Sequence, residues 1–489
     1  MNKVLRNFAI YSAPDLIARL LPFFTLPITT AYLTLQDFGN IALFSLCMVP
    51  FTCLTEYGSA YVMFSSWFKY DKRQQGELLF TLMMLAIVLH VVAILIVSAL
   101  YEPIFSFLLG EGWNNIKDLY WWVVLNVLCQ IPSSLFISWV IIEQRAILSS
   151  SIQTLAIGLG ATVLVTTTVL TQNYRYIIMG NVTVGCAISL IEIGILIRNL
   201  RPGFKMEYLS LIFRVGSPML FRSIFNQTRK QIDRFYVANL WGASNLALYN
   251  LSSQFNNMWS VFGAAFDKSY QPDFYHQLAS GKVDLSDLRR ILFLWFYGGF
   301  LVCSSLFIIG KPVIALLTHE VFIGAYPIML LFSCCIIATL PFLGSGAILI
   351  FHKKTSYLFL CTVISSAFSL LGCVILIPRF GAVGGVLSVW IGGVSNGLLY
   401  FIKKQKLFPN WIIEKTVWFY VLVYHILVAL RVLGEVEVNS LFMIMALALL
   451  TVHGYIRNKN YIIRLYQVHI RSILRKLRLQ IARSSNSSR

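Results

Sequence analysis

Five cations crowd one short stretch of this chain, and a single acid accompanies them. The stretch reads RVGSPMLFRSIFNQTRKQIDR and contains Arg214, Arg222, Arg229, Lys230, Asp233 and Arg234. It lies among apolar segments, so we expect it to be within a membrane. A cation at the bilayer centre costs about 2.5–3.5 kcal/mol on insertion scales. The cations are therefore predicted to line a water-filled cavity, which would attract an anionic substrate.

The positions of these residues around a helix indicate different roles for them. At about 100° per residue, Arg214, Arg222, Arg229 and Asp233 share one helix face. Arg222, Arg229 and Lys230 are the candidates for binding phosphate, because a guanidinium donates to two phosphate oxygens at once. Arg229 and Asp233 are four residues apart, the spacing of an ion pair. Arg214 and Arg234 are expected to extend toward the two membrane interfaces.

The first apolar segment also carries a charged pair. Asp15 and Arg19 are four residues apart and lie between Pro14 and Pro22, with Pro27 beyond them. Prolines interrupt the backbone hydrogen bonds of a helix and favour bending. We interpret this segment as a gate element, with Arg19 as a further cation facing the substrate. The alternative is a local ion pair near the inner interface.

Buried acids are few, and they suggest ion coupling. Glu56 and Glu192 fall within apolar segments, so each is a candidate H+ or Na+ site, as are Asp15 and Asp233. Each glutamate could instead satisfy a neighbouring helix. The cysteines and histidines show no metal-ligand spacing, so we expect no metal and no cofactor. We find no nucleotide-binding loop and no paired catalytic carboxylates, so the chain is not predicted to be an enzyme.

The composition is that of a membrane protein. Hydrophobic residues make up 58% of the 489 residues and charged residues only 12%, whereas soluble domains have about 25% charged residues. The net charge is +19, but the cations cluster in short loops between apolar runs. That distribution indicates membrane topology and not nucleic-acid binding. We expect no cleavable signal peptide.

The predicted fold class is all-α, a polytopic membrane protein of about 14 transmembrane helices. The predicted spans are 8–33, 40–63, 78–101, 119–142, 148–171, 176–197, 209–235, 244–267, 291–310, 327–350, 356–377, 382–402, 416–433 and 440–456. With a cytoplasmic N-terminus, 28 Lys and Arg fall on the cytoplasmic side and four on the other. Both termini are therefore predicted to be cytoplasmic. The external loops are too short to form a catalytic domain.

An internal repeat suggests two lobes. Residues 12–14 (SAP) match 216–218 (GSP), and 40–46 (NIALFSL) match 245–251 (NLALYNL), at offsets of 204 and 205. Six helices per repeat give both copies the same orientation, with the substrate site between them. The predicted divisions are 1–205 (N-lobe, helices 1–6), 206–404 (C-lobe, helices 7–12), 405–456 (helices 13–14) and 457–489 (tail). The tail is basic and amphipathic over 463–481, which favours a helix on the inner membrane surface.

With these motifs, the chain resembles the polysaccharide transport family of bacterial flippases, within the multidrug/oligosaccharidyl-lipid/polysaccharide exporter superfamily. The residues that carry the resemblance are LPFFTLPITTAYLTLQDFGNIAL (21–43) and QIDRFYVANLWGASNLALYNLSSQF (231–255). O-antigen flippases are the most similar group. The resemblance covers the whole chain, and its motifs are loose.

The resemblance implies a function and partners. It implies that an undecaprenyl-diphosphate-linked oligosaccharide is moved from the cytoplasmic to the periplasmic leaflet of the inner membrane, through a cationic central cavity, by alternating access. On this sequence it points to Arg222, Arg229 and Lys230, with Asp15 and Arg19 facing them. A polysaccharide polymerase and a chain-length regulator are candidate partners. The alternatives are a cation-coupled multidrug exporter of the same fold and a lipid II flippase. A glycan polymerase or ligase would need larger external loops.

Overall fold

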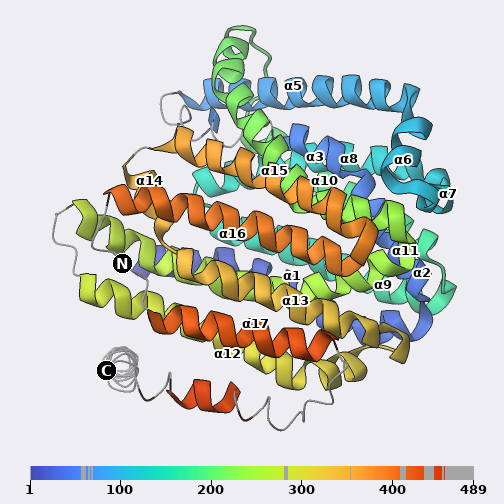
Figure 1. The fold of residues 1–489 in the computed structure, drawn as a ribbon. Helices are drawn as coiled ribbons and strands as arrows, with labels where there is room; N and C mark the ends of the chain where they lie inside the picture. The colour runs from blue at the N-terminus through green and yellow to red at the C-terminus, as the bar shows by residue number, and fades with distance from the viewer. Residues whose placement is uncertain are drawn as a thin grey trace, which may run out of the picture.

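The computed structural model is a layered bundle of long helices (Figure 1). It describes residues 2–56, 62–63, 67, 70–279, 285–352, 354–407, 415–433, 445, 447–453 and 456. This part of the chain contains no strand. We call the end of the bundle at which α1 begins the proximal end, and the opposite end the distal end.

The first half of the chain contains α1 (Asn2–Tyr32), α2 (Leu35–Cys47), α3 (Val49–Glu56), α5 (Lys72–Ala99), α6 (Tyr101–Leu109), η2 (Gly110–Gly112), α7 (Trp113–Ile116), η3 (Lys117–Leu119), α8 (Tyr120–Ile142), α9 (Ala146–Thr171) and α10 (Tyr174–Asn199). The second half contains α11 (Glu207–Ala279), α12 (Leu285–Leu317), η4 (Glu320–Gly324), α13 (Ala325–Thr339), η5 (Leu340–Phe342), α14 (Ser345–Phe351), α15 (Thr355–Phe380), α16 (Ala382–Leu407) and α17 (Lys415–Leu433).

The architecture confirms the all-helical, polytopic membrane fold class. Nine helical segments among the described residues are long and apolar enough to cross a membrane. Two predicted spans are each broken into two helices. The span 40–63 is interrupted at Met48, two residues before Pro50, and the span 327–350 is interrupted near Pro341 and Gly344, whose φ is +76°. Proline lacks the backbone N–H that would bond the carbonyl four residues earlier in a helix. Hydropathy along the sequence does not show such breaks.

Both predicted lobes begin with two helices joined at a sharp break. Between α1 and α2, Thr34 caps the new helix: its Oγ1 accepts the Asp37 N–H at 3.1 Å, and Asp37 accepts the Thr34 N–H at 3.1 Å. In α11, Gly242 (φ +76°, ψ 179°) divides a first arm, residues 207–241, from a second arm, residues 243–279. Asp37 and Gly242 are 205 positions apart, the offset of the repeat. The division into lobes stays a prediction, and we use N-lobe and C-lobe below only as names for residues 1–205 and 206–404.

The two lobes contact each other closely at the distal end. Gly39 of α2 lies against Ala243 so tightly that a Cβ on Gly39 would be 2.0 Å from the Ala243 carbonyl oxygen. The Asn239 side chain donates a hydrogen bond of 2.6 Å to the Phe107 carbonyl of α6. Gly110 (φ +58°) lies directly against the Asn239 backbone. The segment 101–119 therefore caps the end of the first arm of α11.

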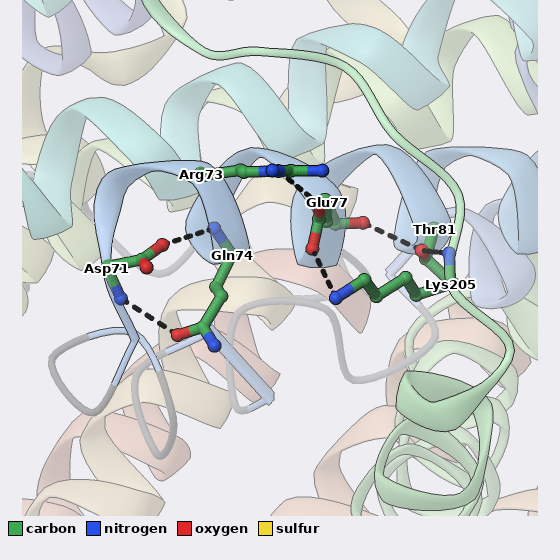
Figure 2. A network of polar contacts seen from close by, with 6 residues as sticks. All are labelled: Asp71, Arg73, Gln74, Glu77, Thr81 and Lys205. Atoms are coloured by element: carbon green, nitrogen blue, oxygen red, sulfur yellow. Dashed lines mark hydrogen bonds and ion pairs between the residues drawn. The ribbon is translucent and has the colours of Figure 1, made fainter.

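The linker between α10 and α11, residues 200–206, is attached to the N-lobe (Figure 2). The buried Glu77 of α5 forms an ion pair with Lys205 Nζ at 3.1 Å and accepts a hydrogen bond from Arg73 Nε at 3.0 Å. The backbone N–H of Lys205 also donates to Thr81 Oγ1 at 3.1 Å. Glu77 raises the pKa of the Lys205 ammonium by hydrogen bonding to it. A raised pKa contributes stability that is lost only as pH rises through it, above ~10.4, so this ion pair persists at neutral pH.

The helix after the C-lobe is joined to it by tyrosines. Tyr424 of α17 donates to the Cys303 carbonyl at 2.9 Å and shares a 2.7 Å hydrogen bond with Ser333 of α13. Only part of the predicted last span, including residues 447–453, is described, and it is helical. The predicted surface helix over 463–481 lies outside the described residues.

We expect Gly39→Ala to destabilise the protein by about 1–3 kcal/mol, because overpacking forces the two backbones apart. Thermal unfolding in detergent would measure this. Gly158→Ala in α9 is the matched control, since a Cβ there meets no heavy atom within 4 Å. Equal melting temperatures for the two variants would contradict the close contact of Gly39 with Ala243.

We expect Lys205→Ala to speed amide hydrogen exchange in residues 200–206 by about two- to fivefold, as an ion pair with one exposed partner contributes modestly. Lys72→Ala is the control: Lys72 also pairs with an acid, Glu143, at 2.9 Å, but Glu143 does not hold the linker. If both variants exchange alike in the linker, the ion pair with Glu77 does not hold it in place.

Candidate functional site: an interlobe cavity

A polar chamber lies between α2 of the N-lobe and α11 of the C-lobe. Its volume is about 270 Å³. Its polar lining consists of Ser45, Gln231, Arg234, Asn250, Ser253 and Gln254. These side chains offer a guanidinium, three amides and two hydroxyls at one place, so the chamber can bind an anion and the hydroxyls of a polar ligand together.

A second chamber of about 270 Å³ adjoins the first and is mostly apolar. It lies along α1, between α1, α9 and α10. The two chambers share Phe38, Ile41 and Gln254 as common lining residues. They therefore lie side by side, with these three residues at their boundary, and we refer to the two together as the cavity.

Arg234 is the only cation among the described residues that line the polar chamber. Its guanidinium is positioned by Gln231 Oε1 at 3.1 Å and by Ser253 Oγ at 3.2 Å. Its buried Nε has no hydrogen-bond partner. A guanidinium held in place with a free donor is suited to a carboxylate or phosphate ligand.

Arg234 also lies close to the distal closure. It precedes Gly242 by eight residues in the sequence, which is about 12 Å along a helix. The contact between Gly39 and Ala243 thus closes the distal side just beyond the polar chamber. An anion bound at Arg234 would lie at the distal part of the cavity.

The prediction for Arg234 was wrong, since this residue lines the cavity and does not extend to the interface. The predicted ion pair of Arg229 with Asp233 is not formed either. Arg229 is half-buried with an unpartnered Nε, and Lys230 is exposed. Neither residue lines the described parts of the two chambers. Both residues lie about one helical turn before Arg234, on the side of the proximal end.

Four other predicted residues lie where the structure describes only the backbone. Asp15 and Arg19 belong to α1, Glu56 ends α3, and Arg222 belongs to the first arm of α11. Their side chains are outside the described part, so their roles stay predictions.

Asp233 points away from the cavity into the C-lobe. It is buried, and its Oδ2 accepts a hydrogen bond from Tyr249 Oη. Its second oxygen, Oδ1, has no hydrogen-bond partner. Tyr249 comes from the second arm of α11, so this bond joins the two arms just below the break at Gly242. Asp233 therefore braces the segment that carries Arg234.

Glu192 is buried inside the N-lobe, in agreement with its prediction as an intramembrane acid. Ser133 Oγ of α8 donates a hydrogen bond to its carboxyl group. Glu192 thus joins α10 to α8. Its predicted role in ion coupling stays a prediction.

The sequence interpretation missed Gln231, Asn250, Ser253 and Gln254, because uncharged polar residues are common in helices. The repeat contained a signal for one of them. Asn250 matches Ser45 at the offset of 205, and both line the polar chamber. Equivalent polar positions in a duplicated helix are expected to face each other across the axis between the lobes.

Comparison with known families identifies the chain. Residues 4–266 match the family described as "Polysaccharide biosynthesis protein". The chain belongs to this family. An uncharacterized membrane protein of Haemophilus influenzae is 23% identical over 407 residues, which cover 78% of this chain and 90% of that protein. A protein of the Lsg locus in the same organism is 20% identical over 425 residues, covering 82% and 98% of the two chains.

Solved structures share the fold. The lipid II flippase MurJ in an inward closed conformation aligns with a TM-score of 0.72 and 13% identity, covering 93% of this chain and 100% of that one. An inward-facing MATE multidrug transporter of the MOP superfamily aligns with a TM-score of 0.60 and 12% identity, covering 80% and 95%. This member of the polysaccharide biosynthesis family thus has the fold of polytopic MOP-superfamily transporters.

We expect Tyr249→Phe to destabilise the protein by about 1–3 kcal/mol, because it leaves a buried carboxyl oxygen without its donor. Tyr297→Phe is the control, since Tyr297 is also buried but donates to a neutral backbone carbonyl, Thr451 O, at 2.6 Å. Thermal unfolding measures both. A smaller loss for Tyr249→Phe than for Tyr297→Phe would mean that Asp233 does not depend on Tyr249.

Proposed function

We propose that this protein is a flippase for an undecaprenyl-diphosphate-linked oligosaccharide, such as an O-antigen or related repeat unit. It would move this substrate from the cytoplasmic to the periplasmic leaflet of the inner membrane, with both termini cytoplasmic. The observation that carries the proposal is the polar chamber between the lobes, with Arg234 fixed at its wall. Membership of the polysaccharide biosynthesis family and the MurJ-like fold support it.

The chamber suits the headgroup of such a lipid. The guanidinium of Arg234, which lines the chamber, would bind a phosphate of the diphosphate. Asn250, Gln254 and Ser45 would donate to and accept from sugar hydroxyls. Arg222, Arg229, Lys230 and Arg19 remain candidates for earlier contacts with the anionic headgroup as it enters from the proximal side.

The distal contacts describe one state of an alternating-access cycle. With the proximal end cytoplasmic, the contact of Gly39 with Ala243 and the cap on Asn239 close the periplasmic side. Opening that side would require α2 and α6 to separate from α11. The polyprenyl tail would stay largely in the lipid while the headgroup crosses.

The membrane potential is sufficient to drive an anionic headgroup outward. An inside-negative potential releases about 2.3 kcal/mol per 100 mV for each negative charge that moves outward. H+ or Na+ antiport through Asp15, Asp233, Glu56 or Glu192 is the other candidate. A polysaccharide polymerase and a chain-length regulator would act on the product outside.

We expect Arg234→Gln to reduce surface glycan at least about tenfold in a deletion strain that expresses the variant, because a hydrogen bond to a charged group contributes about 1.5–3 kcal/mol. Lipid-linked repeat units should accumulate on the cytoplasmic face. Arg214→Gln is the control: Arg214 is an exposed cation near the start of the same helix, so its glycan display should stay near that of the unaltered protein.

Other outcomes would identify another substrate. Normal glycan in both variants would exclude Arg234 as the headgroup site. Intact glycan in the deletion strain itself, with increased drug sensitivity, would favour a multidrug exporter. Support of growth in cells depleted of their lipid II flippase, lost in Arg234→Gln, would favour lipid II as the substrate.

A further inference from the structure

The apolar chamber offers few hydrogen-bonding groups to a ligand. The Thr25 and Thr29 hydroxyls donate to backbone carbonyls of α1, at 3.2 Å and 3.1 Å. The Asn181 amide donates to the Ile177 carbonyl at 3.1 Å. A sugar in this chamber would leave most of its hydroxyls without partners, and burying an unpartnered hydroxyl opposes binding. The chamber therefore favours an apolar occupant.

The chamber is also elongated. Its lining residues on α1 extend from Ala18 to Leu33, which is about 22 Å of helix. Gly160 and Ala161 of α9 leave the space open on the opposite side. Its volume of about 270 Å³ is roughly nine times the share of one water in the liquid, ~30 Å³. A long and narrow apolar space of this size fits a short length of hydrocarbon chain.

The two chambers meet at the point where the proposed substrate changes character. In a polyprenyl-diphosphate-linked glycan, the diphosphate joins an apolar chain on one side to a polar sugar on the other. Phe38, Ile41 and Gln254 line both chambers. A diphosphate bound at Arg234 would therefore have the polar chamber around it and the apolar chamber beside it.

We propose that the apolar chamber binds the isoprene units next to the diphosphate, so that the carrier lipid is recognised as well as the sugar. This inference rests on the proposed function. It follows that part of the lipid chain enters the cavity together with the headgroup. The isoprene units next to the diphosphate would lie along α1. A glycosyl diphosphate carried on a polar group, such as a nucleoside, would lack this contact and bind more weakly.

Binding of soluble diphosphates to the purified full-length protein in nanodiscs tests the proposal by calorimetry. The probes are inorganic diphosphate and geranyl diphosphate, and titration of empty nanodiscs corrects for partition into lipid. We expect geranyl diphosphate to bind at least about tenfold more tightly than inorganic diphosphate, since each buried methylene adds to affinity.

Variants in α9 test whether the tighter binding of geranyl diphosphate depends on the apolar chamber. Gly160→Leu adds a side chain toward the apolar chamber, where a Cβ meets only Asn181 Oδ1, at 3.6 Å. It should remove most of the geranyl preference and keep the affinity for inorganic diphosphate. Gly158→Leu is the matched control two residues away, at a position with open space around it, and should keep the preference.

Each outcome decides between the two proposals. If inorganic diphosphate binds but geranyl diphosphate binds no more tightly, the prenyl chamber is wrong and the flippase function stands. The chamber is also wrong if Gly160→Leu and Gly158→Leu keep the same preference. If neither diphosphate binds, or if Arg234→Gln binds both unchanged, the assignment of the headgroup to Arg234 fails, and the prenyl chamber fails with it.

Discussion

Hydrocarbon offers no hydrogen-bond partner, and this single constraint decides where every polar group of the protein lies. Within the bilayer, a polar side chain must find a protein partner or face an enclosed aqueous space. Glu192 accepts from Ser133, Asp233 accepts from Tyr249, and Tyr424 shares a hydrogen bond with Ser333. Six other polar side chains lie together at the junction of α2 with the two arms of α11, where they line the polar chamber: Ser45, Gln231, Arg234, Asn250, Ser253 and Gln254.

The same constraint explains which features of the fold could be predicted. Hydropathy located the long apolar helices, and the breaks at Thr34 and Gly242 fall in the gaps between the predicted spans 8–33 and 40–63 and between 209–235 and 244–267. Hydropathy did not locate the breaks at Met48 and Gly344, because the apolar pattern of the sequence continues across each interrupted helix. Contact with lipid constrains only the polarity of a segment. The breaks depend instead on single prolines and glycines and on the close contacts that these residues permit.

The cationic helix was predicted to line a substrate cavity, and one of its residues, Arg234, lines the polar chamber. Charge and helical periodicity pointed to Arg222 and Arg229, whereas Arg234 is the cation that the structure places in the chamber. Periodicity gives directions relative to one helix axis and does not say which neighbour lies in each direction. The break at Gly242 folds the second arm back beside the first, and Ser253 of that arm holds Arg234. No pattern within the first arm contains this information.

The first arm of α11 contacts both predicted lobes, the N-lobe at its start and both lobes near its end. Near its start, Tyr208 and Ile212 are buried against the N-lobe, and the linker before them is held by Glu77. Near its end, Val237 packs beside Gly385 of α16, within the C-lobe. If the lobes rotate against each other as proposed, a helix held by both of them would have to bend. Its first third contains Gly216 and Pro218, residue types that weaken the resistance of a helix to bending. The conformational energy of the cycle would then be held as curvature of one helix, and the stiffness of that helix would set how fast the protein changes state.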